Sequence, residues 1–311
     1  MTDNAPTSVV IAAHTMQRCA ALTEAVASVL AQQSPPDEVV VAVDNNTDLY
    51  EWVRQRLPSV VPVHNQGVRG ASATRNAGVR IASGSILAFL DDDAVARPDW
   101  LRHLTSPLAR CDVAGVGGFL EPVWLGRTPK WMPEEFLWVV GASYRGLPST
   151  PAPVRNVWSG NMAVRKADFL RVQGFLEDFG KTGGVSRPED TEFCIRLTAA
   201  LEGLTWWYEP TARVGHSVPP GRGTLRFFVQ RCYNEGRGKA DLAALRGRRE
   251  GLRDERRHAA KTLPMGMHRE LRHAVANREF AAVQRMSAIG VGLGAAGLGY
   301  ILRQAQVRIT A

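Results

Sequence analysis

Cysteine is scarce in this chain of 311 residues, and its four cysteines lie far apart, at Cys19, Cys111, Cys194 and Cys232. Structural zinc sites need ligands at short paired spacings, and small disulfide-stabilised domains need many cysteines. The scattered cysteines therefore argue against both a zinc site and a disulfide framework. They fit a protein of the reduced cytoplasm.

The chain also lacks a dinucleotide-binding fingerprint and an N-terminal secretion signal. Gly115 to Gly118 follows an apolar run and is expected to end a strand, but Phe119 to Trp124 does not have the helical pattern that the fingerprint requires. His14 to Arg18 contains no glycine, whereas sugar nucleotidyltransferases carry a glycine-rich loop after the first strand. The polar start, Met1 to Thr7, has no charged-then-apolar signal segment. These absences disfavour an NAD enzyme, a nucleotidyltransferase and a secreted protein.

The overall composition is that of a globular protein with a basic excess. Hydrophobic residues make up 45% and charged residues 22% of the chain, which suits one large or two small domains with a sizeable core. The formal net charge is +8, and most of the excess lies between Arg213 and Arg272. A basic balance suits nucleic acid, an anionic membrane or a phosphate-bearing substrate, and charge alone does not choose among them.

The first half of the chain alternates between strand and helix patterns. Short apolar runs predict strands at 8–13, 38–43, 60–63 and 86–90, and apolar residues at helical spacing predict helices at 18–33 and 70–83. This alternation is typical of an α/β protein with a mostly parallel, Rossmann-like sheet. The loops that follow the strands then open at one edge of the sheet, where such folds bind ligands.

Carboxylates gather at that expected edge. Asp91-Asp92-Asp93 directly follows a buried strand, and adjacent carboxylates repel one another, so a cation is a natural way to stabilise them. Hard oxygen ligands suit Mg²⁺ or Mn²⁺ held against phosphate oxygens. Asp44 ends the second strand, where it could accept hydrogen bonds from a base or a ribose. The alternatives are a solvated acidic turn for the triplet and an Asx turn for Asp44.

Several motifs in order resemble glycosyltransferase family 2 over about residues 8 to 240. They are Ser8-Val9-Val10-Ile11, Val43-Asp44-Asn45-Asn46-Thr47-Asp48, Thr74-Arg75-Asn76-Ala77-Gly78, Phe89-Leu90-Asp91-Asp92-Asp93, Pro188-Glu189-Asp190 and His216. The resemblance implies a GT-A fold, a nucleotide-diphosphate sugar donor, a divalent metal (Mn²⁺ or Mg²⁺) and inversion at the anomeric carbon. No nucleic-acid partner is expected.

The resemblance also implies roles for particular residues. Asp93 resembles the metal-holding aspartate of the family's DxD motif, and His216 a further metal ligand or diphosphate contact. Asp190 resembles the catalytic base. The predicted nucleotide and donor contacts are His14, Asp44, Arg75, Asn76, Asp91, Asp92, Asn161 and Glu189. The chain departs from the family at Ala12-Ala13-His14-Thr15, where Pro-Thr-Tyr-Asn is frequent, and at Asn45, where a second aspartate is frequent. These departures leave the nucleobase open.

Simpler roles remain open for the same residues. Glu189 and Asp190 stand at the first turn of a predicted helix, where acidic residues stabilise the helix end by ~0.3–1 kcal/mol. His216 could be a structural histidine, and Asn161 part of a turn before a buried strand. The functional alternatives are a sugar nucleotidyltransferase on a similar fold and a non-catalytic module that binds nucleotide sugars.

The chain is expected to contain a catalytic domain at 1–240, with a nucleotide-binding half at about 8–118 and an acceptor half at about 119–240. A basic, helical extension is expected at 241–311, after a turn at Tyr233 to Gly236. Its apolar, glycine-rich stretch, Met286 to Leu302, is borderline in length for a membrane span. It predicts peripheral contact with the inner face of the cell membrane and a lipid-linked or otherwise amphipathic acceptor. The alternative is a helix packed against a partner subunit.

Overall fold

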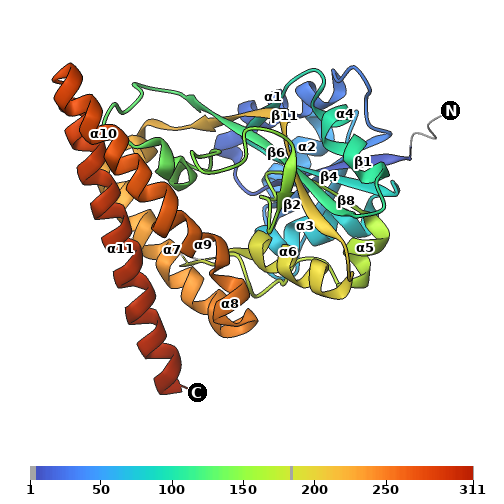
Figure 1. Ribbon diagram of the computed structural model, residues 1–311. Coiled ribbons are helices and arrows are strands. Elements are labelled where there is room, and N and C mark those ends of the chain that lie inside the picture. Colours follow the sequence, from blue (N-terminus) through green and yellow to red (C-terminus); the bar gives the residue numbers. More distant parts are fainter. Residues whose placement is uncertain (1–4, 183–184, 311) are drawn as a thin grey trace. The chain divides into compact units, whose positions relative to one another are not determined.

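The computed structural model describes residues 5–182 and 185–310, and the chain divides into two compact units (Figure 1). Unit 1 comprises Met1–Leu120, Pro148–Gly184 and Glu189–His216. Unit 2 comprises Glu121–Leu147, Val185–Pro188 and Ser217–Ala311. The predicted domain boundary near residue 240 stays a prediction.

Strands and helices alternate through the first half of the chain, and helices dominate its end (Figure 1). The strands are β1 (Thr7–Ala13), β2 (Glu38–Asp44), β3 (Val61–Asn65), β4 (Ile86–Asp91), β5 (Ala94–Ala96), β6 (Val113–Trp124), β7 (Ala152–Val154), β8 (Asn161–Arg165), β9 (Lys181–Thr182), β10 (Val185–Ser186) and β11 (Thr205–Val218). The α-helices are α1 (Cys19–Leu30), α2 (Thr47–Arg56), α3 (Ala71–Ile81), α4 (Trp100–Thr105), α5 (Lys166–Arg171), α6 (Glu189–Ala200), α7 (Leu225–Arg246), α8 (Arg248–Gly251), α9 (Arg253–Arg257), α10 (Leu263–Asn277) and α11 (Phe280–Thr310). Short 3₁₀ segments are η1 (Met16–Arg18), η2 (Ser106–Ala109), η3 (Glu134–Val140) and η4 (Pro220–Gly223), and η5 (His258–Thr262) is a π-helical turn.

The main sheet has the strand order β3-β2-β1-β4-β8-β6-β11-β5, with β7 paired to β11. The pairs among β3, β2, β1 and β4 are parallel, so these four strands end at the same edge. The pairs β4–β8, β6–β8 and β11–β5 are antiparallel. The predicted α/β fold and the helical C-terminal extension are both confirmed, and the sheet as a whole is mixed, with the Rossmann-like parallel pairs among β3, β2, β1 and β4.

The central strands are apolar throughout because both faces of the sheet are covered. Val9 and Ile11 of β1 point into one hydrophobic cluster with α1 and α2, whereas Val10 points into a second cluster with α3 and α6. Alternation along an extended strand sends neighbouring side chains to opposite faces. A strand that is buried on both faces therefore needs an unbroken apolar run.

The structure corrects three expectations from the sequence. Gly115 to Gly118 does not end a strand, because β6 continues to Trp124. Tyr233 to Gly236 is not a turn but lies inside α7. The helix α2 was not predicted, because it buries only Leu49 and Val53 and thus carries a weak periodic signal.

The glycines behind two of these errors are needed for close packing. A methyl group on Gly118 would overlap the carbonyl oxygen of Ala212 in β11, within unit 1. One on Gly236 would overlap the carbonyl oxygen of Ala296 in α11, within unit 2. In both cases glycine marks a close backbone approach and not a chain reversal.

We expect Gly118→Ala to lower the free energy of unfolding by about 1–3 kcal/mol, the usual cost of forcing extra volume into a packed region. The measurement is thermal or denaturant unfolding of the full chain. Gly221→Ala is the control, because a methyl group there has no heavy atom of the described residues within 4 Å apart from its chain neighbours. Equal stability of the two variants would contradict the packing described for β6.

Candidate functional site

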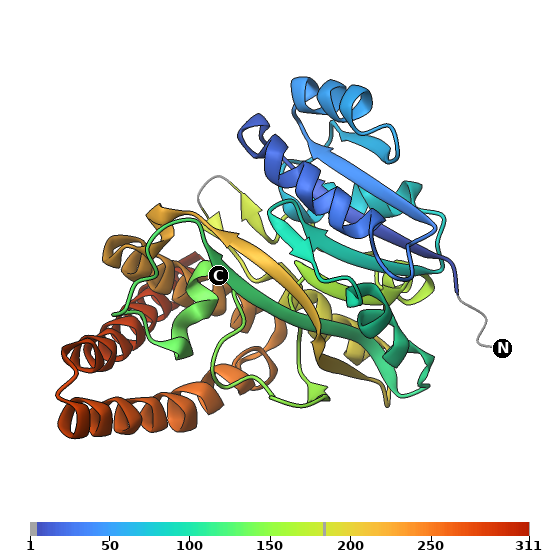
Figure 2. The same ribbon diagram turned by 90° about the horizontal axis from the view of Figure 1, so that it is seen from above.

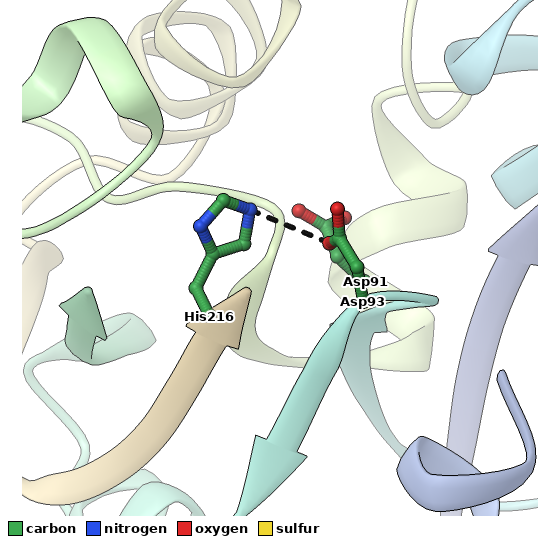
Figure 3. A group of neighbouring side chains, drawn as sticks. All are labelled: Asp91, Asp93 and His216. Carbon is green, nitrogen blue, oxygen red and sulfur yellow. Dashed lines mark ion pairs between the residues drawn. The ribbon is translucent and has the colours of Figure 1, made fainter. Parts of the chain in front are cut away.

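Strand pairing brings His216 beside the acidic run. Strand β4 ends at Asp91, and β5 begins three residues later at Ala94. His216 of β11 lies opposite Ala94 in the antiparallel β11–β5 pair. The register therefore sets the histidine next to Asp93, which directly precedes Ala94 (Figure 3).

Asp91, Asp93 and His216 form a group that could hold a metal ion. One ligand atom from each of these three residues can be chosen so that all lie within 4.8 Å of one another. His216 Nε2 lies 3.3 Å from Asp93 Oδ1 (Figure 3). His216 and Asp93 are buried, and Asp91 is half-buried. Two carboxylates and one imidazole are a donor set that divalent metals use in proteins.

Buried polar atoms at this group are also left without a partner. Among the residues that the structure describes, Oδ2 of Asp92 and Nδ1 of His216 are buried and have no hydrogen-bond partner. Such atoms carry a desolvation cost of about 1–3 kcal/mol each. A cation and its waters would reduce that cost, so the residues present fit a metal.

Arg18 pairs with two of the three aspartates. Its Nη1 lies 2.7 Å from Asp92 Oδ1 and 3.1 Å from Asp93 Oδ2. The sequence interpretation assigned Arg18 no role in the site. Its position in the sequence could have indicated one. Arg18 closely follows β1, and β1 is the parallel neighbour of β4, the strand that ends at Asp91. A cation in that loop therefore reaches the same edge of the sheet.

Arg75 joins the acidic run to the start of helix α6. Its Nη2 lies 2.8 Å from Asp91 Oδ1, and its Nη1 lies 3.5 Å from Glu189 Oε1. Arg75 is buried, and Asp190 is also close enough to interact electrostatically with it. Two predicted site segments that lie about 100 residues apart in the sequence, at Asp91 and at Glu189, thus share one guanidinium group.

Burial and neighbouring negative charge raise the pKa values of two of these carboxyl groups. Burial raises the pKa of Asp92 to about 6, with Asp93 acting in the same direction and Arg18 against it. Burial, and then the neighbouring Asp190, raise the pKa of Glu189 to about 7, although Arg75 opposes the shift. Carboxyl groups with raised pKa values at one sheet edge are typical of functional sites.

The proposed base lies at the first turn of α6, as predicted. Asp190 Oδ1 accepts hydrogen bonds from the backbone N–H of Thr191 at 2.7 Å and from its hydroxyl at 3.4 Å. Asp190 is half-buried. Its carboxylate therefore helps to stabilise the helix start, and a catalytic role for it remains a prediction.

Two of the predicted donor contacts have structural tasks. Asn161 is fully buried, accepts from Trp100 Nε1 at 2.8 Å, and donates to the carbonyl oxygens of Phe119 and Ala212. Asn76 is buried and bonds both backbone groups of Phe175. The donor roles of Asn161 and Asn76 stay predictions.

Asp44 and His14 lie at the ends of β2 and β1. Asp44 Oδ2 accepts from the backbone N–H of Gly70 at 3.0 Å, and its Oδ1 accepts from Asn45 Nδ2 at 3.0 Å. Asp44 thus orders the segment that leads into α3. The side chain of His14 is exposed, and its carbonyl oxygen accepts from Asn46 Nδ2 at 3.2 Å. Their nucleotide contacts also stay predictions.

Comparison with known proteins shows a family match and a relative that is similar over nearly the whole chain. The profile described as "Glycosyl transferase family 2" matches residues 8–172. The "Glucosyl-dolichyl phosphate glucuronosyltransferase" of Haloferax volcanii is 31% identical over 299 residues, which cover 94% of this chain and 95% of the relative.

Two solved structures resemble the chain at 17% sequence identity. "Mannosyltransferase PcManGT from Pyrobaculum calidifontis in complex with GDP-Man and Mn2+" has a TM-score of 0.60 and covers 94% of this chain and 86% of its own. "GalNAc-T7 with UDP, GalNAc and Mn2+" has a TM-score of 0.53 and covers 75% of this chain. The present chain spans 48% of the length of that second structure. Both likenesses concern the fold.

The raised pKa of Glu189 gives a testable pH dependence of stability. Between the ordinary value of 4.5 and the folded value of about 7, the folded protein holds a proton that the unfolded chain has lost. The free energy of unfolding therefore falls as pH rises through this interval. Glu189→Gln has no proton to lose, so its stability should fall less between pH 4.5 and 7 than that of the wild type.

The measurement is denaturant unfolding at several pH values, without nucleotide or metal. The control is Glu51→Gln, on the exposed surface of α2, which shows how the loss of one surface carboxylate changes the free energy of unfolding. Asp92 has a shift of the same sign and is present in all three proteins, so it does not affect the comparison. If the free energies of unfolding of the wild type and Glu189→Gln fell equally with pH, Glu189 would not titrate as described.

Proposed function

This chain belongs to glycosyl transferase family 2 and has the GT-A fold, and we propose that it transfers a sugar from a nucleotide-diphosphate donor to an acceptor hydroxyl with inversion. The observation that carries the proposal is the pairing of Arg75 with both Asp91 and Glu189. It supports a single site in which an acidic, cation-binding edge and a second carboxylate, Asp190, act on the same sugar.

Asp190 is the proposed base. An acceptor hydroxyl is a poor nucleophile until its proton is removed, and a carboxylate at hydrogen-bond distance can accept that proton. The hydroxyl oxygen then forms a bond to the anomeric carbon while the bond from that carbon to the diphosphate breaks. The diphosphate leaves with the electron pair. One displacement inverts the anomeric carbon, and no covalent intermediate with the protein is needed.

Asp91, Asp93 and His216 are the proposed ligands of a divalent metal. Such an ion would stabilise the negative charge that grows on the departing diphosphate. An imidazole ligand suits transition metals better than Mg²⁺, which favours oxygen ligands, so Mn²⁺ is the first candidate. Both similar structures were solved with Mn²⁺, which is consistent with this choice.

The side chains around the acidic edge are the proposed donor contacts. Arg75 holds Asp91 and Glu189 in place, and all three are proposed to line the nucleotide and donor sugar with Asp92. Arg18 sets the position of Asp92 and Asp93 through its two ion pairs. A fixed arrangement of these charges before the donor binds lowers the cost of reorganisation during transfer.

A lipid-linked acceptor is the finer proposal. The 31% identical relative is named for a dolichyl-phosphate-linked acceptor and covers nearly the whole chain. The C-terminal helices have a basic and an apolar surface, which is consistent with an enzyme that acts at the cytoplasmic surface of a membrane. The sugar and the nucleobase are left open by the departures at Ala12 to Thr15 and at Asn45.

We expect Asp190→Asn to lower the turnover number by about 10²- to 10⁴-fold, the usual contribution of a positioned general base. Donor binding should remain, because the amide keeps the size of the side chain and an oxygen acceptor for the N–H of Thr191. The measurements are sugar transfer from a panel of nucleotide sugars, and the thermal shift produced by nucleotide diphosphates with Mn²⁺.

Asp168→Asn is the matched control. It removes an acidic residue from the first turn of another helix, α5, and should leave turnover unchanged. Unchanged turnover in Asp190→Asn would overturn the assignment of the base. No transfer by the wild type, with nucleotide-sugar binding retained, would favour a non-catalytic binding module.

A further inference from the structure

Helix α11 presents an exposed apolar face along most of its length. Among the described residues, Phe280–Gln306 is the one helix long and apolar enough to cross a membrane, and 22% of its most apolar window is buried. Most of its exposed apolar side chains lie three, four, seven or eight residues apart, which places them on one face of a helix. They include Phe280, Val283, Val291, Leu298, Ile301 and Leu302, which are 41–72% exposed.

This face carries no charge. Its remaining positions include Gln284, Ser287, Gly290, Gly294 and Gly297. Among the described residues, no heavy atom outside the adjoining turns of α11 itself lies within 4 Å of a methyl group built on any of these three glycines, so the face is open. Open apolar faces of this length are uncommon in proteins that meet only water.

The opposite face of α11 is packed against other elements of unit 2. A methyl group on Gly299 would overlap the carbonyl oxygen of Tyr233 in α7, and one on Gly292 would lie 2.5 Å from the ring of Phe136 in η3. Figure 1 shows α11 beside α7. The helix is therefore held along one side and open along the other.

Ion pairs fix both ends of the apolar stretch. Near its start, Arg285 Nε lies 2.7 Å from Glu270 Oε2 of α10, and Arg285 Nη2 lies 3.0 Å from Glu279 Oε1. Near its end, Arg303 Nε lies 2.6 Å from Asp241 Oδ1 of α7. Moving α11 into the core of a bilayer would break these pairs and leave buried charges without partners, which is strongly unfavourable.

Helix α10 extends the open surface and gives it a positive edge. The chain turns back at Arg278 and Glu279, between α10 and α11 (Figure 2). Met265, Leu271 and Val275 of α10 are 49–74% exposed. Beside them, His268, Arg272 and His273 line an open hollow of about 690 Å³.

The charge of these two helices suits an anionic partner. No aspartate or glutamate occurs from residue 280 to the end of the chain, and Glu270, the acidic residue of α10, is buried in ion pairs with Arg269 and Arg285. A bilayer with anionic headgroups offers apolar depth next to negative charge, and this matches an apolar face with a basic edge.

We propose that α10 and α11 form a docking surface for a bilayer that contains anionic phospholipid, with α11 lying along the bilayer surface and not crossing it. The apolar face, from Phe280 to Leu302, enters the boundary between headgroups and acyl chains. Arg272 with His268 and His273 contacts lipid phosphates. The inference concerns binding alone and does not rest on the proposed sugar transfer.

The experiment is flotation of the full chain with phosphatidylcholine vesicles, with and without phosphatidylglycerol. The wild type should bind the anionic vesicles, less at high salt, and be released by alkaline carbonate because no helix spans. The double variant Leu298→Gln with Ile301→Gln should bind on the order of tenfold or more weakly, since two aliphatic side chains no longer enter the apolar layer. Arg272→Gln should weaken binding to the anionic vesicles alone.

The matched control is Leu170→Gln with Ile81→Gln, which changes the same residue types at 51% and 55% exposure, against 53% and 64% for Leu298 and Ile301. This control should bind as the wild type does, and circular dichroism with thermal unfolding checks that both double variants fold. Resistance to carbonate would overturn the in-plane arrangement in favour of a span. The wild type could instead fail to bind vesicles and form a dimer in solution that the Leu298/Ile301 double variant does not form. That result would overturn the proposal and assign the face to contact with a second copy of the chain.

Discussion

Carboxylate charge accumulates at the carboxyl edge of the sheet in unit 1, and two arginine side chains hold it there. Arg18 pairs with Asp92 and Asp93, and Arg75 pairs with Asp91 and Glu189. Asp190 adds a further negative charge within range of Arg75. The guanidinium groups do not balance the cluster, and two of its carboxyl groups have raised pKa values as a result of burial and mutual repulsion. Surplus negative charge of this kind favours the binding of a cation at the site.

The sequence predicts the strands that form this edge of the sheet. Unbroken apolar runs predict β1, β2 and β4 because strands covered on both faces have no solvent side, and the acidic run after β4 marks the ligand-binding edge. The resemblance of the motifs to one family also identified the start of α6, whose two carboxylates could equally have been helix caps. Sequence reasoning therefore located most of the charged cluster.

The rest of the site depended on tertiary contacts that no local pattern records. Arg18 meets the aspartates only because β1 and β4 are neighbours in the sheet. Asn161, a predicted donor contact, is fully buried and bonds Trp100 and two carbonyl oxygens, which the sequence did not indicate. Gly236 was predicted to lie in a turn but lies in α7. Because glycine has no side chain, the backbone of α11 can approach α7 closely at this position. In each case the deciding partner is remote in the chain.

The claim that the acidic edge is a metal site completed by His216 can be tested by pulsed electron paramagnetic resonance of Mn²⁺ bound to the protein with a nucleoside diphosphate. The arrangement of Asp91, Asp93 and His216 predicts a hyperfine coupling to one histidine nitrogen, which disappears in His216→Ala. Mn²⁺ that binds the wild type with couplings to phosphorus and water protons alone, and to no nitrogen, would contradict it.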